Sequence, residues 1–178
     1  DGRGGDDKFL VASGINVPLR LSGGTGNDTI EGGSGNDELF GNLGEDTLLG
    51  YGGQDKLVGG LDNDRLEGGD GNDELFGEDG SDRLYGGNGR DVLIGALGND
   101  FLDGEGDDDF ADGGNSNDEV HGGDGNDELR GGLGTDQLFG DGGNDFLYAA
   151  NSSNATEAGV AHTIYGGQGD DFIYGDLG

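Results

Sequence analysis

Aspartate recurs at a fixed interval of nine residues along most of the chain. Fourteen consecutive nine-residue units run from Gly23 to Tyr148, and the sixth position is Asp in every unit. Two outlying units, Gly2 to Leu10 and Gly166 to Tyr174, carry the same pattern. Carboxylates at such regular spacing are candidate ligands of a hard cation. The candidate metal ligands are Asp7, Asp28, Asp37, Asp46, Asp55, Asp64, Asp73, Asp82, Asp91, Asp100, Asp109, Asp118, Asp127, Asp136, Asp145 and Asp171.

The surrounding residues favour Ca²⁺ over other metal ions. Ca²⁺ takes six to eight oxygen ligands in flexible geometry, whereas Mg²⁺ requires a stricter octahedron and retains water. Zn²⁺ prefers His or Cys, which the repeats do not supply as ligands. Glycine opens every unit, and a glycine-rich turn exposes backbone carbonyl oxygens that can complete a calcium site. These first-position glycines are Gly23, Gly32, Gly41, Gly50, Gly59, Gly68, Gly77, Gly86, Gly95, Gly104, Gly113, Gly122, Gly131 and Gly140.

The nine-residue period also predicts the elements that position these ligands. The fourth position is Gly in 11 of the 14 units, so we expect the first six residues to form a tight turn. Positions seven to nine then form a short strand whose eighth residue points inward. Two units make one coil, and stacked coils give an all-β parallel β-roll, a right-handed β-helix. The inward residues are Ile30, Leu39, Leu48, Leu57, Leu66, Leu75, Leu84, Leu93, Leu102, Ala111, Val120, Leu129, Leu138 and Leu147.

Alternate turns stack in this geometry, so each edge of the roll carries a column of carboxylates. One column begins at Asp28 and the other at Asp37, and each takes its carboxylates from every second unit. Carboxylates about 5 Å apart repel one another unless cations lie between them. Fourteen turns give about 12 complete sites, and their cations would reduce the net charge from −31 to about −7.

Composition supports a chain that needs such cations to fold. It contains 46 Gly, 39 acidic and only 8 basic residues, a composition that borders on intrinsic disorder. The acidic balance argues against nucleic acid and anionic lipid as partners. No apolar run is long enough to span a bilayer, so we expect no membrane insertion by this segment. The absence of Cys excludes disulfides and thiolate chemistry.

Units such as GGSGNDELF at Gly32 and GGDGNDELF at Gly68 match the consensus GGxGxDxUx. On these repeats the chain resembles the RTX (repeat-in-toxin) family, with its haemolysin-type calcium-binding nonapeptide repeat. The resemblance implies Ca²⁺ in the turns and export from Gram-negative bacteria by type I secretion. It further implies a secreted or cell-surface location and fusion to further domains, such as proteases, lipases, epimerases, toxins or adhesins. Such modules stay unfolded at low calcium and fold outside the cell.

Four segments are expected: a degenerate N-terminal repeat or cap over 1–22, fourteen repeats over 23–148, an insertion over 149–165 and terminal repeats over 166–178.

Departures from the consensus predict local irregularity. Asp62, Asp107 and Ser116 replace the fourth-position Gly, and Ala111 should thin the core. His162 stands where an Asp is expected; it either replaces a calcium ligand or marks a broken turn, and we favour the broken turn. His121 is interpreted as an ordinary exposed strand residue.

The sequence favours a folding and stabilising module, folded by Ca²⁺ after secretion, in a larger bacterial protein. Two alternatives remain: a rigid segment of an adhesin or surface protein, and a polysaccharide-binding module as in epimerases. A polysaccharide site should show aromatic and basic residues in line on one sheet face. The aromatic ninth-position residues are Phe40, Phe76, Tyr85, Phe139 and Tyr148. We expect no catalytic activity, because nothing arranges a triad and metal-held carboxylates shuttle protons poorly.

Overall fold

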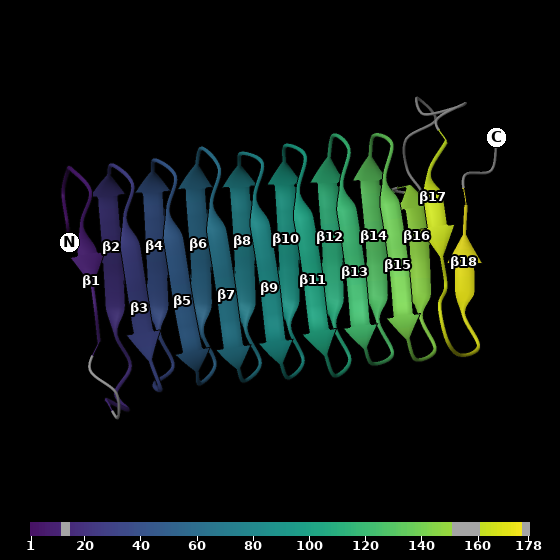
Figure 1. Ribbon diagram of the computed structural model, residues 1–178, viewed down its shortest axis with the longest axis horizontal. Coiled ribbons are helices and arrows are strands. Elements are labelled where there is room, and N and C mark those ends of the chain that lie inside the picture. Colours follow the sequence, from purple (N-terminus) through teal and green to yellow (C-terminus); the bar gives the residue numbers. More distant parts are fainter. Residues whose placement is uncertain (12–14, 151–160, 176–178) are drawn as a thin grey trace.

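The computed structural model describes residues 1–11, 15–150 and 161–175. These residues form 18 strands and no helix. The strands stack into a rod with β1 (Lys8–Phe9) at one end and β18 (Phe172–Tyr174) at the other (Figure 1). The predicted all-β roll of parallel strands is therefore confirmed. Over the same described ranges, no helix is long and apolar enough to cross a membrane.

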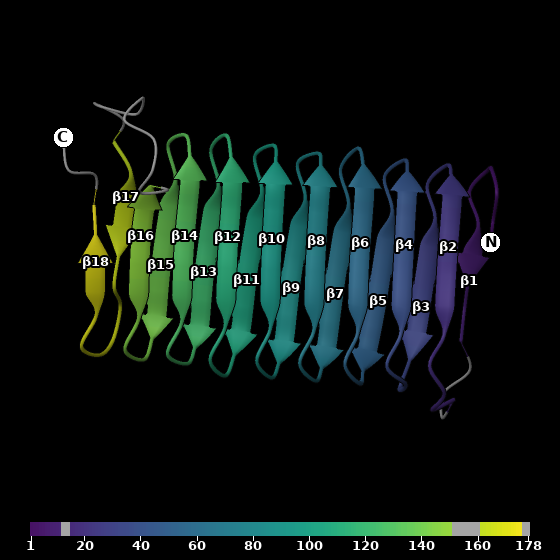
Figure 2. The ribbon, with the colours of Figure 1, turned by 180° about the vertical axis from the view of Figure 1, so that it is seen from behind.

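The strands alternate between two parallel sheets of nine strands each, which lie back to back (Figures 1 and 2). Sheet A contains β1, β3 (Thr29–Gly33), β5 (Thr47–Gly52), β7 (Arg65–Asp70), β9 (Arg83–Asn88), β11 (Phe101–Gly106), β13 (Glu119–Asp124), β15 (Gln137–Gly142) and β17 (Thr163–Tyr165). Sheet B contains β2 (Arg20–Thr25), β4 (Glu38–Leu43), β6 (Lys56–Leu61), β8 (Glu74–Asp79), β10 (Val92–Leu97), β12 (Phe110–Asn115), β14 (Glu128–Leu133), β16 (Phe146–Ala150) and β18.

The pairing register shows that one coil consists of two repeat units. Leu48 on β5 is paired with Leu66 on β7, and the same step recurs in sheet B. At the C-terminal end the step widens, because Leu147 pairs with Ile173. This wider step takes up the extra residues around 149–165, of which 151–160 lie outside the described residues. The two-unit coil predicted from the repeat is thus present throughout the regular part of the rod.

A single row of inward side chains from each sheet forms the core. All fourteen predicted inward residues, from Ile30 to Leu147, are fully buried. Phe9, Leu21 and Ile164 pack against this core near its ends and are only partly buried. Ala111 keeps its inward position and its register with Leu93, so the small residue does not interrupt the sheet.

The strands are longer and the turns shorter than the repeat pattern predicts. β8 begins at the seventh position of one unit and ends at the third position of the next. The expectation of a six-residue turn followed by a three-residue strand is therefore wrong. Gly77, at a first position, is buried within this strand. A Cβ atom there would lie 2.3 Å from Asp82 Oδ2, so only Gly lets the extended backbone pass so close to the carboxylate.

The expected irregularity at the fourth position is not seen. Asp62, Asp107 and Ser116 adopt positive φ angles of 76°, 75° and 84°, as most of the fourth-position glycines do. Their backbones stack on the neighbouring turns as the glycines do, since a Cβ at Gly80 would lie 1.8 Å from Asp62 O. These three residues therefore have a strained, left-handed backbone conformation, and the stacking of the turns is unchanged.

Candidate metal sites

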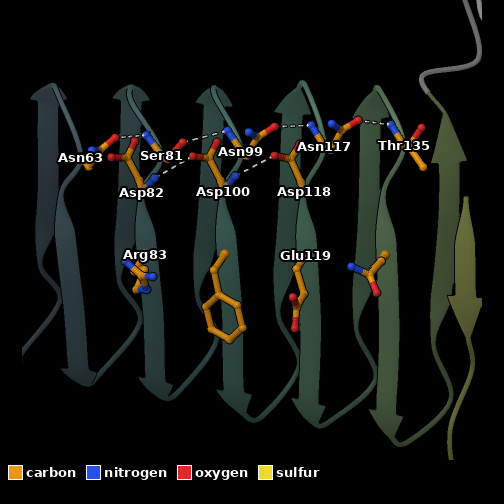
Figure 3. A pocket seen from close by; sticks show the side chains of 12 residues that line it. Asn63, Ser81, Asp82, Arg83, Asn99, Asp100, Asn117, Asp118, Glu119 and Thr135 are labelled. Carbon is orange, nitrogen blue, oxygen red and sulfur yellow. Dashed lines mark hydrogen bonds between the residues drawn. The ribbon is translucent and has the colours of Figure 1, made fainter.

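The sixth-position aspartates form two continuous columns, one along each edge of the rod. In each column Oδ1 accepts a hydrogen bond from the backbone N–H of the Asp one coil earlier, for example Asp82 N to Asp100 Oδ1 at 2.8 Å and Asp100 N to Asp118 Oδ1 at 2.9 Å (Figure 3). The first column contains Asp28, Asp46, Asp64, Asp82, Asp100, Asp118 and Asp136. The second contains Asp37, Asp55, Asp73, Asp91, Asp109, Asp127 and Asp145. This arrangement matches the predicted columns.

The second carboxylate oxygen, Oδ2, is buried without a hydrogen-bond partner in most of these aspartates. Within the described residues, such an Oδ2 occurs in Asp7, Asp28, Asp37, Asp46, Asp55, Asp64, Asp73, Asp82, Asp91, Asp100, Asp109, Asp118, Asp127 and Asp145. Burying an unpaired carboxylate is very unfavourable, so folded proteins pair such groups or use them to coordinate a metal. A row of these atoms along both edges is the expected signature of cation sites.

Backbone carbonyls share this buried space with Oδ2. A Cβ built on Gly41 would lie 2.3 Å from Asp46 Oδ2 and 2.7 Å from Gly59 O. The same pair of oxygens surrounds Gly68, at 2.5 Å from Asp73 Oδ2 and 2.6 Å from Gly86 O. First-position glycines therefore leave room where a carboxylate of one turn meets the carbonyl of the next coil. Carboxylate and carbonyl oxygens are the donor set that Ca²⁺ prefers, and the residues fit this ion.

The buried carboxylates cannot all ionise in this fold without a counter-ion. Burial, together with the nearby aspartates and against the lowering effect of the backbone hydrogen bond, raises the pKa of Asp64, Asp109 and Asp118 to about 8. Burial likewise raises the pKa of Asp55 and Asp100 to about 7. At neutral pH each column must therefore hold protons or bind cations.

The columns continue into the units at both ends. At the N-terminal end Asp7 donates its N–H to Asp28 Oδ1 at 2.7 Å. At the C-terminal end Asp145 N–H is bonded to Asp171 Oδ1 at 3.1 Å. His162 takes the place of an Asp in the first column, because Asp136 N–H donates to His162 Nδ1 at 3.3 Å. The imidazole thus takes the position of the missing carboxylate, whereas residues 151–160, which precede it, lie outside the described residues, so the interpretation of a broken turn stays a prediction.

A second ladder, which the sequence interpretation missed, runs beside the aspartates at the fifth position. Asn63 Oδ1 accepts from Ser81 N at 2.7 Å, and Asn99 Oδ1 accepts from Asn117 N at 2.9 Å (Figure 3). Asn117 Oδ1 in turn accepts from Thr135 N at 2.8 Å. The eight fifth-position Asn residues were the available signal. The ladder holds adjacent turns in register and so fixes the positions of the carboxylates.

His121 lies on sheet A, away from both columns. Its ring nitrogens are 3.1 Å from Glu119 Oε1 and 3.1 Å from Asp141 Oδ2. The ring stacks on Phe139, with centroids 4.4 Å apart. Only part of its side chain is exposed, 24%. The prediction of an ordinary strand residue holds for its position, but the ring is packed and paired rather than freely exposed.

Comparison with known proteins agrees with the repeat geometry. The family model described as the RTX calcium-binding nonapeptide repeat matches residues 20–48, 49–84, 76–111, 85–120, 112–147 and 163–178. These matches cover most of the chain and every column aspartate from Asp28 to Asp145. A search of curated proteins gives no match. The repeats, the parallel roll and the two carboxylate columns together place the chain in the family of RTX calcium-binding nonapeptide repeats.

Proposed function

We propose that this calcium-binding β-roll is a folding and stabilising module of a larger secreted bacterial protein, and that it folds when Ca²⁺ becomes available outside the cell. The observation that carries this proposal is the double row of buried Oδ2 atoms without hydrogen-bond partners. The core consists of one inward side chain per strand, too little apolar burial to offset the ordering of a glycine-rich chain. Metal binding would therefore supply the missing folding free energy.

The residues proposed to hold the ions are the column aspartates, through Oδ2, and the first-position glycines, through their carbonyl oxygens. About 12 ions fit between successive turns of the fourteen regular units, and Asp7 and Asp171 extend the columns further. Each ion would lie between two coils, so each turn is completed by its neighbour. Such nearest-neighbour coupling makes folding cooperative along the rod. Extracellular calcium modules typically have dissociation constants of about 10⁻⁴ to 10⁻³ M.

Far-ultraviolet circular dichroism during a calcium titration from chelator tests this function directly. The expected result is a steep change from a disordered to a β spectrum near millimolar Ca²⁺, with no such change in equal Mg²⁺. A β spectrum already present in chelator at neutral pH would mean that the columns tolerate their charge without metal. That outcome would refute folding on calcium binding.

A rigid spacer in an adhesin or surface protein is the second candidate, and the shape of the rod favours it. β1 and β18 lie at opposite ends of a straight stack (Figure 2). Domains attached before β1 and after β18 would therefore be held apart. Small-angle scattering with and without calcium would test this role, because a spacer requires a rod that keeps its length when it is embedded between flanking domains.

Binding of a polysaccharide through the sheet faces is less well supported. Sheet A carries a row of rings, and Phe139 lies between His121 and Tyr165 at centroid distances of 4.4 and 5.3 Å. The planes are within 15° of parallel, so both faces of Phe139 are covered by neighbouring rings. On sheet B the Phe40 and Phe76 rings are covered by the cations of Arg20 and Lys56. A sugar ring would have to displace these contacts before it could stack.

A further inference from the structure

Sheet B presents an apolar outer surface that the fold does not require. Its ninth-position residues Phe40, Val58, Phe76 and Ile94 lie in one column, in register from strand to strand. A second column of third-position leucines runs beside it, interrupted at Asp79 and, beyond Leu97, at Asn115. These leucines, Leu43, Leu61 and Leu97, are 43%, 44% and 47% exposed. Contiguous apolar surface of this kind on a soluble protein marks an interaction site.

Between β2 and β8 the two columns enclose a groove, and Arg3 and Glu78 also line it. Its volume is about 510 Å³, and its walls include Phe40 and Val58 on one side and Leu43 and Leu61 on the other. The floor is backbone, because a Cβ at Gly60 would lie only 2.3 Å from Asn42 O. A side-chain ridge from another surface could therefore lie in the groove.

The equivalent positions of sheet A are more polar. Its ninth-position residues include Glu31, Glu67 and Asp103, and its third-position residues include Asp70 and Asp124. The inward residues and turns are the same for both sheets, so the requirements of the roll do not explain the apolar character of sheet B. This surface calls for an occupant.

We propose that sheet B is the interface between two copies of this chain, packed face to face. The ridge of ninth-position residues in each copy would lie in the groove of the other, which makes the contact self-complementary. A partner that contacts the columns over several strands must match the spacing between those strands. A second copy of the same roll has the same strand spacing. Sheets commonly pack in this way, with their strand directions nearly aligned.

Area and charge agree with this occupant. The nine strands of sheet B, spaced about 4.8 Å apart and each about 20 Å long, present roughly 800 Å², which is the area that one partner buries in a standard stable interface. Four of these strands, β4 to β10, carry the apolar columns, and the others would form the polar part of the contact. The cations of β2 and β6 are paired within the sheet, whereas the exposed Glu78 and Asp79 of β8 add negative charge to it. Arg20 forms an ion pair with Glu38, and Lys56 lies 3.9 Å from Glu74. Sheet B therefore adds less repulsion between copies than the acidic sheet A would.

The proposal rests on the calcium-bound fold, so its test is made at saturating Ca²⁺ with circular dichroism recorded on the same samples. Sedimentation equilibrium of the full chain should show a concentration-dependent dimer. The double variant Leu61→Lys/Leu97→Lys should weaken the dimer at least about tenfold. The matched control Ser34→Lys/Asn88→Lys adds the same charge at third positions of sheet A and should leave the dimer unchanged.

A second readout uses the absence of cysteine from the chain. Leu97→Cys should form a disulfide-linked dimer under mild oxidation, whereas Asn88→Cys should not. A folded chain that stays monomeric at high concentration would overturn the dimer and leave the surface to a different partner. Equal weakening by both lysine pairs would also overturn it. Failure of the chain to give a β spectrum in calcium would instead count against the proposed calcium-driven folding.

Discussion

The edges of the roll and its sheet faces have been shaped by different constraints. Along the edges, the sixth position is Asp and the first is Gly in every one of the fourteen regular units. On the faces, the ninth position of sheet B alone changes from Phe40 through Ile94 to Asp112 and Arg130. An edge residue contacts the turns before and after it within a buried space. A face residue contacts its column neighbours and solvent, so many side chains are compatible with the same backbone.

The comparison indicates that the edges control whether the chain folds, whereas the faces control what the folded rod contacts. Asp100 illustrates the first constraint, since its Oδ1 accepts from Asp82 N and its own N–H donates to Asp118 Oδ1. Phe76 illustrates the second, with Lys56 placed over its ring at 4.9 Å. Changes at the edges should therefore affect calcium binding and folding together, and changes on the faces should affect neither strongly.

The largest effect is expected from pH in the absence of metal, because it acts on every edge carboxylate at once. Burial raises the pKa of Asp64 and Asp118 from the ordinary value of 3.8 to about 8. A raised folded-state pKa gives stability that is present below pH 3.8 and is lost as pH rises through about 8. In chelator, β structure should therefore increase on acidification from pH 8 to pH 4. Circular dichroism measures this directly.

In a calcium titration the sign should reverse, because protons compete with the metal for the same carboxylates. The calcium midpoint should rise as pH falls below about 7, the range in which Asp55 and Asp100 take up protons. Identical pH dependence with and without calcium would contradict the assignment of these carboxylates to the metal sites.

Adding a side chain at a stacked turn should cause the next largest loss of stability. Gly71 has a φ of +139°, and a Cβ there would lie 1.5 Å from Gly53 O. Gly71→Val should therefore destabilise the calcium-bound roll by more than about 4 kcal/mol, measured by denaturant unfolding. Asp62→Gly is the matched control, because it removes a side chain at the same repeat position in another turn. Because Asp62 has a φ of 76°, this variant should be neutral or stabilised by up to about 1 kcal/mol.

Removal of one central carboxylate should weaken two metal sites. Asp73 lies between Asp55 and Asp91 in its column, and its Oδ2 is buried without a hydrogen-bond partner. Asp73→Ala should therefore lower the calcium stoichiometry by about two and raise the folding midpoint several-fold, as isothermal titration calorimetry would show. Phe76→Ala, nearby on the face of sheet B, should leave the stoichiometry unchanged. Loss of a single site with normal neighbours would argue against ions shared between coils.

The sequence predicts the edges better than the faces for the same physical reason. A residue used identically in every coil, such as Asp100 or Leu102, produces a periodic signal that one sequence is enough to reveal. Strand length was mispredicted because Gly77 was interpreted as a turn residue, although its backbone is extended and buried. The place of His162 in the column could not be predicted, because it depends on a wider step along the chain, which the nine-residue period does not contain.

The faces offer the smallest expected effect. Phe139 stacks between His121 and Tyr165, and each aromatic pair contributes about 0.5 to 1.5 kcal/mol beyond burial. Phe139→Ala should therefore lower the stability of the calcium-bound roll by about 2 kcal/mol and leave the calcium stoichiometry intact. Leu49→Ala, at the same repeat position, should cost less because its column neighbours are Glu31 and Glu67. Thermal unfolding in excess calcium separates the two variants. If Phe139→Ala also reduced the number of bound ions, the faces and the edges would be coupled, and the division between folding edges and contact faces would not hold.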